Sequence, residues 1–158
     1  MIGDCWITAR DPETEDKMKI EIRPFQPEDE AAVIRLWTDC GLVVPWNNPA
    51  RDMARKRRVQ PELFLLGWKD GALVATVMAG YDGHRGWLNY LAVDPAYRRG
   101  GVGRFLVAEA EARLGAMGCP KINLQVRSAN SEVIEFYKKI GFVEDDVVSL
   151  GRRLEPDG

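Results

Sequence analysis

The chain contains few of the residues that build metal sites or disulfide frameworks. It has three cysteines and one histidine among 158 residues. Cys5, Cys40 and Cys119 are widely separated, and no Cys-x-x-Cys pair occurs. Zinc sites and disulfide-stapled folds need clustered or regularly spaced cysteines and histidines. We therefore predict no metal site and no disulfide framework, and the cysteine pattern fits a reducing cytoplasm.

The sequence also lacks a long apolar run and a strong charge of either sign. No apolar run approaches the roughly 18 residues that a membrane-spanning helix needs, and the acidic residues near the N-terminus argue against a signal peptide. The formal net charge is -2, whereas nucleic-acid binders are usually basic. The basic run at 55–58 is typical of a solvated helix face. We expect a cytoplasmic protein with no membrane or nucleic-acid partner.

The composition is that of a folded globular protein. It includes 46% hydrophobic and 29% charged residues, and the chain is long enough for one domain with its own core. Residues 1–17 are acidic, contain Pro12 and show no clear periodicity, so we predict a flexible N-terminal extension. Residues 18–158 form the predicted domain. Met18 offers an alternative translation start to Met1.

Hydrophobic periodicity switches between strand and helix patterns along this domain. Strands are predicted at 20–24, 63–68, 72–81, 87–93 and 122–126, with a final strand or strand pair at 143–154. Helices are predicted at 27–40, 52–58, 103–117 and 130–140. Because hairpins come first and β-α-β units later, we expect an α/β (mixed α+β) fold. Its central sheet should have six to seven strands, flanked by about four helices.

A glycine-rich turn separates the strand at 87–93 from the long helix that follows. The turn reads Arg98-Arg99-Gly100-Gly101-Val102-Gly103, and Arg104 comes next. Free N–H groups at a helix start bind anions, and glycine lets the backbone approach a phosphate closely. The turn has neither the Lys-Ser/Thr of a P-loop nor the third glycine of a dinucleotide fingerprint. It therefore predicts an anion site, but neither a P-loop NTPase nor a dehydrogenase.

The same turn resembles the signature of the GCN5-related N-acetyltransferase (GNAT) family. The family pattern Arg/Gln-x-x-Gly-x-Gly/Ala is matched by Arg98, Gly101 and Gly103. The preceding strand, which ends in Leu91-Ala92-Val93, also resembles the family's context for that pattern. A turn of this kind by itself is also typical of an ordinary surface turn at a helix start, so a second motif is needed.

A second motif lies downstream at the separation found in this family. Asn130, Tyr137 and Gly141-Phe142 resemble its Asn…Tyr-x-x-x-Gly-Phe helix. Together the two motifs extend the resemblance over residues 19–154. The chain is most similar to the bacterial branch that includes ribosomal-protein N-terminal acetyltransferases and an uncharacterised relative of theirs.

The resemblance implies a GNAT-type fold, whose sheet is splayed between the fourth and fifth strands. It implies acetyl-CoA as the acyl-donor co-substrate and direct attack of a primary amine in a ternary complex. Pantetheine would lie in the splay, where an N–H near Leu91 would polarise the thioester carbonyl. The implied cofactor-binding residues are Leu91, Ala92, Val93, Arg98, Arg99, Gly100, Gly101, Val102, Gly103, Arg104, Asn130 and Tyr137.

The resemblance assigns an acid but leaves the base open. Tyr137 would donate a proton to the departing thiolate. Related ribosomal-protein enzymes have a glutamate on the strand after the glycine-turn helix, where this chain has Gln125. A carboxamide takes no proton at neutral pH, so the base lies elsewhere, a water relay removes the proton, or the acceptor amine has a low pKa. Asp82 and His84 are further candidates, although turn chemistry is the plainer interpretation for both.

The acceptor side is less specified. The resemblance places Trp46, Asn47 and Tyr81 near the acceptor, together with Asp82 and Gln125. The acceptor is expected to be a small-molecule or peptide amine, and the protein a monomer or a homodimer. The alternative function is a non-catalytic acyl-CoA-binding sensor or regulatory module. The glutamine at position 125 favours that alternative, and Tyr137 argues against it.

Overall fold

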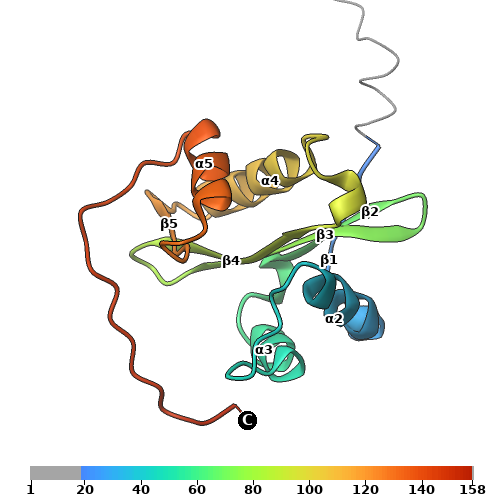
Figure 1. Ribbon diagram of the computed structural model, residues 1–158, viewed down its shortest axis with the longest axis horizontal. Helices are drawn as coiled ribbons and strands as arrows, with labels where there is room; N and C mark the ends of the chain where they lie inside the picture. Colours follow the sequence, from blue (N-terminus) through green and yellow to red (C-terminus); the bar gives the residue numbers. More distant parts are fainter. Residues whose placement is uncertain (1–18, 158) are drawn as a thin grey trace, which may run out of the picture.

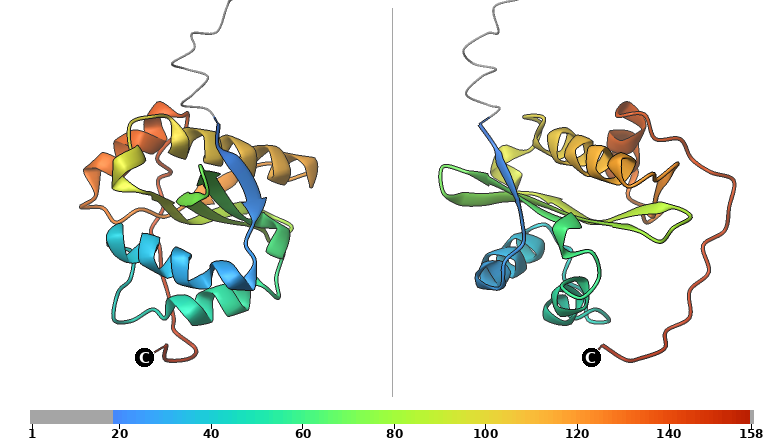
Figure 2. Two further views of the ribbon diagram at one scale, coloured as in Figure 1. Left: turned by 90° about the vertical axis from the view of Figure 1, so that its right-hand side faces the viewer. Right: turned by 180° about the vertical axis from the view of Figure 1, so that it is seen from behind.

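The computed structural model describes residues 19–157 (Figure 1). The N-terminal extension predicted at 1–17 lies outside the described residues. In the described part, one sheet lies between two layers of helices (Figures 1 and 2). The mixed α/β architecture that the sequence predicts is therefore confirmed.

A series of hairpins builds most of the sheet. Its strands, side by side in chain order, are β1 (Glu21–Pro24), β2 (Phe64–Lys69), β3 (Ala72–Tyr81), β4 (Gly86–Val93) and β5 (Ile122–Leu124). The first four pair antiparallel, and β5 runs parallel to β4. Asp70 and Gly71 turn the chain between β2 and β3 with φ angles of 50° and 77°. Positive φ at both residues is what a tight two-residue hairpin turn requires.

Two helices cover each face of the sheet. Helices α2 (Glu30–Asp39) and α3 (Pro49–Lys56) lie on one face, and α4 (Val102–Ala116) and α5 (Ser131–Lys139) lie on the other (Figure 2). These four helices agree with the predicted number. Strand β3 is buried from residue 74 to 77, because its successive side chains point alternately into the two layers.

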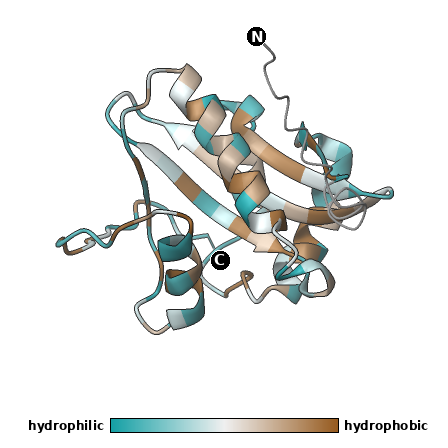
Figure 3. Ribbon diagram, turned by 90° about the horizontal axis from the view of Figure 1, so that it is seen from above, coloured by the Kyte–Doolittle hydropathy of each residue, from teal (hydrophilic) through white to brown (hydrophobic). Residues whose placement is uncertain are grey.

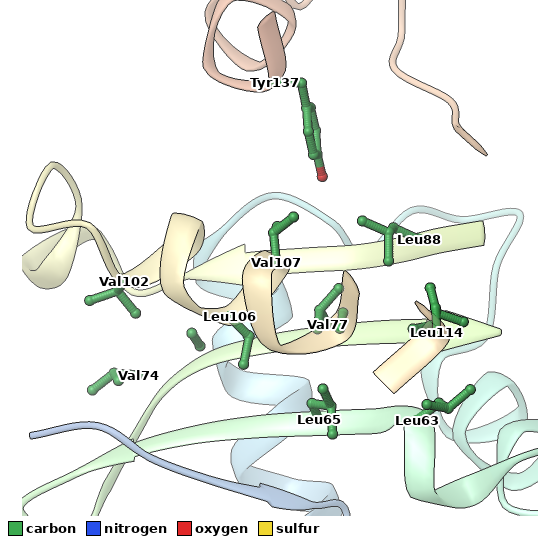
Figure 4. Close-up of a cluster of buried hydrophobic side chains, with 13 residues drawn as sticks. Leu63, Leu65, Val74, Val77, Leu88, Val102, Leu106, Val107, Leu114 and Tyr137 are labelled. Carbon is green, nitrogen blue, oxygen red and sulfur yellow. The ribbon is translucent and has the colours of Figure 1, made fainter. Parts of the chain in front are cut away.

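The larger of two hydrophobic clusters fills the space between α4 and the sheet. Leu65, Val77 and Leu88 of the strands meet Leu106 and Leu114 of α4 (Figure 4). Figure 3 shows α4 lying across strands that are rich in apolar residues. The smaller cluster, under α2 and α3, includes Trp37, Met53, Phe64 and Leu66. Burial on both faces fixes where β4 and the start of α4 lie.

A buried carboxylate holds the connection from β1 to α2. Asp29 is only 5% exposed. Its two oxygens accept hydrogen bonds from the Arg23 guanidinium at 2.8 and 2.9 Å, and one also accepts from the Gln26 backbone N–H at 2.8 Å. The bond with Arg23, followed by that with Gln26, lowers the pKa of Asp29. The carboxylate therefore stays charged near neutral pH and stabilises the entry to the helix.

The sheet has five strands, so the prediction of six to seven was wrong. No strand follows β5 among the described residues, and every residue from 143 to 156 is exposed. A strand needs a hydrogen-bonded neighbour as well as alternating side chains. Asp145 of this segment instead pairs with Lys121 at 2.7 Å, and Asp157, just after it, pairs with Arg55 at 2.6 Å. Strand β5 also ends at Leu124, two residues earlier than predicted.

Candidate functional site

The glycine turn places an uncapped helix start among three exposed arginines. Arg99 and Gly101 have φ angles of 64° and 82°, and the chain enters α4 directly after Gly101. No side chain caps this helix, and its first turn contains no acid. Its first backbone N–H groups are therefore available to an anion. Arg98, Arg99 and Arg104 are exposed and add positive charge around them.

Two residues of the turn fix its position against the rest of the fold. Val102 is 6% exposed and belongs to the core under α4. Gly103 is buried, and a Cβ at this position would lie 3.3 Å from both Val93 of β4 and Phe136 of α5. A larger side chain would push these elements apart. Gly103 therefore lets β4, α4 and α5 meet closely beside the turn.

The pairing of β4 with β5 stops halfway along β4. Three residue pairs join the strands, and the last is Leu88 with Leu124. Strand β4 continues to Val93, so its residues 89–93 have no partner in β5. The segment Leu91-Ala92-Val93 lies in this stretch, just before the glycine turn. A stretch of strand without a neighbour on one side can pair with an extended ligand.

A bulge in β4 coincides with this unpaired stretch. Thr76 of β3 faces Ala92 and Met78 faces Asn89, so two β4 residues lie opposite Val77 alone. One of those two, Tyr90, has a φ of 50°. Such a conformation is costly for a residue other than glycine and is often found at functional sites. The bulge changes the direction of the strand next to Leu91.

Hydrogen bonds and ring stacking hold this bulge. The Thr76 hydroxyl donates to the Tyr90 carbonyl at 2.9 Å and accepts from the Trp37 indole at 2.9 Å. Thr76 and Trp37 are fully buried. The Tyr90 ring stacks on Trp37, with centroids 3.9 Å apart. The bulge is therefore a built feature of the core and not a frayed edge.

Tyr137 lies on the α4 side of the sheet. It is 8% exposed and packs edge-on against Phe136 and Phe142. Figure 4 shows its hydroxyl pointing from α5 toward Val107 and Leu88. Burial raises the pKa of Tyr137 to about 12. The phenol therefore keeps its proton at neutral pH and can donate it.

Asn130 and Gln125 make local contacts at the two ends of the β5–α5 connection. Asn130 is the N-cap of α5, where its side-chain oxygen accepts from the Val133 N–H at 3.4 Å. Gln125 lies one residue beyond β5, is exposed, and donates to the Ser149 hydroxyl. Its amide thus already binds the C-terminal part of the chain.

The opposite face of the sheet has an open pocket of about 540 Å³. It is lined by Asn47, Asp52, Arg55, Lys56, Val59, Met78, Asn89, Tyr90, Arg153 and Asp157. The Tyr90 hydroxyl donates to Asp52 at 2.5 Å, and burial, followed by this bond, raises the pKa of Tyr90. Arg55 binds both Asp52 and Asp157. Because Tyr90 belongs to the bulge, the pocket reaches the unpaired stretch of β4.

Comparison with known proteins decides the family. The model of the acetyltransferase (GNAT) family matches residues 20–142. The chain belongs to the GNAT family. An uncharacterized N-acetyltransferase of Yersinia pestis is 46% identical over 138 residues, which cover 87% of this chain and 98% of the relative. The resemblance seen in the two sequence motifs is therefore confirmed.

Solved GNAT structures share the fold of this chain. The ribosomal-protein-S18-alanine N-acetyltransferase of Escherichia coli has a TM-score of 0.67 and 24% identity, covering 80% of this chain and 79% of that chain. The PaiA N-acetyltransferase of Thermoplasma acidophilum, in complex with coenzyme A, has a TM-score of 0.64 and 25% identity. That match covers 83% of this chain and 94% of the other.

The predicted acceptor residues of this GNAT protein lie in separate places. Asn47 lines the pocket. Trp46 is 50% exposed and lies 5.3 Å from the Arg127 guanidinium. The Tyr81 hydroxyl donates to the carbonyl of Gly83, in the turn after β3, and to that of Gly118, in the turn after α4. The fold thus brings Asn47, but not Tyr81, to the pocket.

Asp82 of this GNAT protein has the geometry of a turn residue. Its carboxylate accepts from the backbone N–H groups of Arg85 at 2.7 Å and His84 at 2.8 Å, and from the Trp87 indole at 3.2 Å. The bonds from Arg85 and then His84 lower the pKa of Asp82. A carboxylate that is stabilised in its charged form is a weaker base. These contacts favour turn chemistry over catalysis for Asp82.

Sequence reasoning missed the residues that shape the pocket. Asp52 lies on α3 and Tyr90 on β4, and Asp157 comes from the far end of the chain. None of the three is part of a motif, so only their meeting in space identifies them. No cluster of metal ligands occurs among residues 19–157. In the same part of the chain, no helix has the length and apolarity needed to cross a membrane.

Proposed function

We propose that this GNAT protein transfers the acetyl group of acetyl-CoA to a primary amine by direct attack in a ternary complex. Acetyl-CoA is the acyl donor of the family to which the chain belongs. The observation that carries the proposal is the uncapped start of α4 with its surrounding arginines, next to a strand that lacks a neighbour. This arrangement suits a long ligand with a phosphate group at one end and an extended, amide-containing arm at the other.

The glycine turn is the proposed pyrophosphate site. Backbone N–H groups at Gly101, Val102 and Gly103 would donate to phosphate oxygens, because they have no helical acceptors. Arg98, Arg99 and Arg104 would supply attraction over a longer range. The Arg98 Nε already donates to the Val93 carbonyl at 3.1 Å. Arg98 would thereby join the turn to the strand that binds the cofactor's arm.

The unpaired stretch of β4 is the proposed site for pantetheine. The backbone of Leu91, Ala92 and Val93 would pair with the amides of the arm, as a strand pairs with its neighbour. The bulge at Tyr90 supports a role for the next N–H, at Leu91, in binding the thioester carbonyl. A positioned N–H of this kind stabilises the negative charge that develops on oxygen during acyl transfer.

Tyr137 is the proposed proton donor, and Asn130 orients its helix. With a pKa of about 12, the phenol is protonated at neutral pH. A free thiol has a pKa of about 8.5, so complete proton transfer to the thiolate is uphill. Tyr137 would therefore stabilise the leaving sulfur mainly as a hydrogen-bond donor. Asn130, as the N-cap of α5, would hold the start of the helix that presents Tyr137.

The proposed route for the amine proton is water in the pocket. Gln125 has no basic atom and binds Ser149, and Asp82 is stabilised as a turn carboxylate. The pocket carboxylates Asp52 and Asp157 both pair with Arg55. An open, polar pocket beside the bulge gives the attacking amine direct contact with solvent. Its volume suits a small-molecule amine or the end of a peptide, with Asn47 and Asn89 as hydrogen-bonding partners.

An acceptor screen tests this function against that of a non-catalytic acyl-CoA-binding module. The purified protein is incubated with acetyl-CoA and panels of small amines and peptide N-termini, and release of free thiol is followed. Calorimetry with acetyl-CoA is run in parallel. Binding with amine-dependent thiol release supports the enzyme. Tight binding without release from any panel supports the sensor, and failure to bind rejects the cofactor site as well.

A further inference from the structure

The pocket already holds a carboxylate that belongs to the chain itself. The segment after α5 is exposed from residue 143 to 156 and comes back to α3 (Figures 1 and 2). The side chain of the next residue, Asp157, is only 5% exposed. Its two oxygens accept hydrogen bonds from the Arg55 guanidinium at 2.6 and 3.3 Å, and the Arg153 guanidinium lies 3.8 Å away. Arg55 thus forms a basic wall of the pocket, and a carboxylate occupies it.

This contact has the geometry by which a guanidinium recognises a carboxylate. Two nitrogens of Arg55 donate to two different oxygens of Asp157. Such a fork selects a carboxylate by shape as well as by charge. The bond and charge of Arg55, followed by a backbone hydrogen bond from Asn48, lower the pKa of Asp157. The surroundings therefore stabilise the ionised form of a carboxylate at this place.

The positive charge around this place exceeds that of the acids beside it. Residues 49–58 contain five cations and one acid, Asp52, although the whole chain has a formal net charge of -2. Arg57 and Arg58, just after α3, are exposed and have no side-chain partner among residues 19–157. A basic surface attracts anionic ligands and raises their local concentration. The charge distribution therefore favours a ligand that carries negative charge.

Hydrogen bonds connect the basic wall to the bulge in β4. One oxygen of Asp52 accepts from the Tyr90 hydroxyl, and the other accepts from Arg55 at 3.1 Å. Tyr90 directly precedes Leu91, whose N–H is the proposed partner of the thioester carbonyl. A molecule whose carboxylate binds Arg55 therefore lies in the same pocket as the proposed site of acetyl transfer, and its amine can extend toward the bulge.

We propose that Arg55 is a carboxylate subsite of the acceptor pocket, so that the acceptor is an amine that also carries a carboxylate, and that Asp157 occupies this subsite when no acceptor is bound. The inference rests on the proposed function, which places the acceptor amine in this pocket. An arriving carboxylate replaces one pair with Arg55 by another of the same kind. Asp157 belongs to neither hydrophobic cluster, so its release opens no core.

Acceptor pairs that differ only in the carboxylate test the subsite. β-Alanine is compared with β-alaninamide, and γ-aminobutyrate with its amide. A peptide with aspartate after its N-terminal alanine is compared with the same peptide carrying asparagine there. For the preferred pair, kcat/KM should be at least about tenfold higher with the carboxylate, because charge-assisted hydrogen bonds are the strong ones. The pair with the largest ratio shows whether the carboxylate belongs to a free amino acid or to a peptide.

Substitution of Arg55 tests its role in this preference. Arg55→Gln should reduce the ratio to about one, because the fork and its charge are lost. Arg55→Lys keeps the charge without the fork and should give an intermediate ratio, which keeps the test open if the glutamine variant does not fold. Arg113→Gln is the matched control. It breaks the pair with Glu109 at 2.9 Å on the other face of the sheet, and should keep the wild-type ratio.

Substitution of Asp157 tests whether it competes with the acceptor. Asp157→Asn should lower KM for the carboxylate acceptors by at least about threefold, because a larger fraction of the protein then has a free subsite. Asp145→Asn is the matched control, since it breaks another ion pair of the segment after α5, with Lys121 at 2.7 Å. This control should leave that KM unchanged. An equally unchanged KM in Asp157→Asn would overturn the assignment of Asp157 as the occupant.

Calorimetry with β-alanine in the presence of coenzyme A separates the subsite from acetyl transfer. Without an acetyl group, binding is measured in the absence of reaction. Binding that prefers β-alanine to its amide, and that Arg55→Gln abolishes, supports the subsite. If no acceptor then yields product, only the transfer function is rejected. Equal product formation from both members of every pair would overturn the subsite and leave the transfer function standing, and so would a preference that survives Arg55→Gln.

Discussion

A negative charge placed at the glycine turn should weaken coenzyme A binding by an amount that depends on salt. Gly101 is exposed, and a Cβ there meets no atom within 4 Å. Its φ of 82° nevertheless strains most side chains. Asparagine and aspartate tolerate this left-handed region best and have nearly the same shape. Comparing Gly101→Asp with Gly101→Asn therefore separates charge from backbone strain.

The magnitude follows from Coulomb's law. In a solvent-exposed site, repulsion between a carboxylate and two phosphate charges about 6 Å away weakens ligand binding by about 1.4 kcal/mol. That is a roughly tenfold ratio of the two dissociation constants at low salt. At about 0.15 M salt the Debye length is about 8 Å, so screening should reduce the ratio to about threefold.

Calorimetric titration with coenzyme A at both salt concentrations measures this ratio. Thermal unfolding of each variant without ligand checks that both fold equally well. If the two variants bind alike at low salt, or if their ratio does not change with salt, then the pyrophosphate does not lie at this turn. A loss of binding shared equally by both variants would point to backbone strain alone.

Three other substitutions have distinct signatures. Tyr137→Phe should lower kcat about tenfold with little change in KM, because a thiolate leaves tolerably well without help. With the Tyr137 pKa at about 12, the ratio of the variant's rate to the wild-type rate should be constant from pH 7 to about 10. If the two rates become equal near pH 9, the phenol is not buried as described. Thr76→Val should cost about 2 kcal/mol in urea unfolding, since it leaves the buried Trp37 indole N–H without its acceptor; an unchanged midpoint would show that this hydrogen bond does not stabilise the fold. Asp29→Asn should cost about 2 kcal/mol at pH 7. Because folding lowers the pKa of Asp29, that difference should be constant above about pH 5 and shrink as the pH falls below about 4.

Local patterns in the sequence determined the family and most of the elements. The residues of the glycine turn by themselves predicted an anion site at a helix start, and the resemblance of this turn and of the Asn130–Tyr137 motif to the family implied the rest. The hairpins and the four helices were also predictable, since they depend on side-chain period and on turn residues. Both signals act within a few residues of the chain.

Only the tertiary structure decided how distant residues meet. The bulge at Tyr90 arises because the buried Thr76 and Trp37 hold its carbonyl and its ring. The pocket brings together Asp52, Tyr90 and Asp157 from three separate parts of the chain. Neither the bulge nor the pocket produces a periodic pattern in the sequence, because each depends on how two layers of helices pack against one sheet.

The segment 143–154 shows most clearly what the sequence determined and what only the tertiary structure decided. Its sequence predicted a final strand or strand pair. The prediction that it adds strands to this sheet was wrong. The period of side chains is a property of the segment alone, whereas a strand also needs a partner for its backbone groups. Where that partner lies is decided by the fold and not by the sequence pattern.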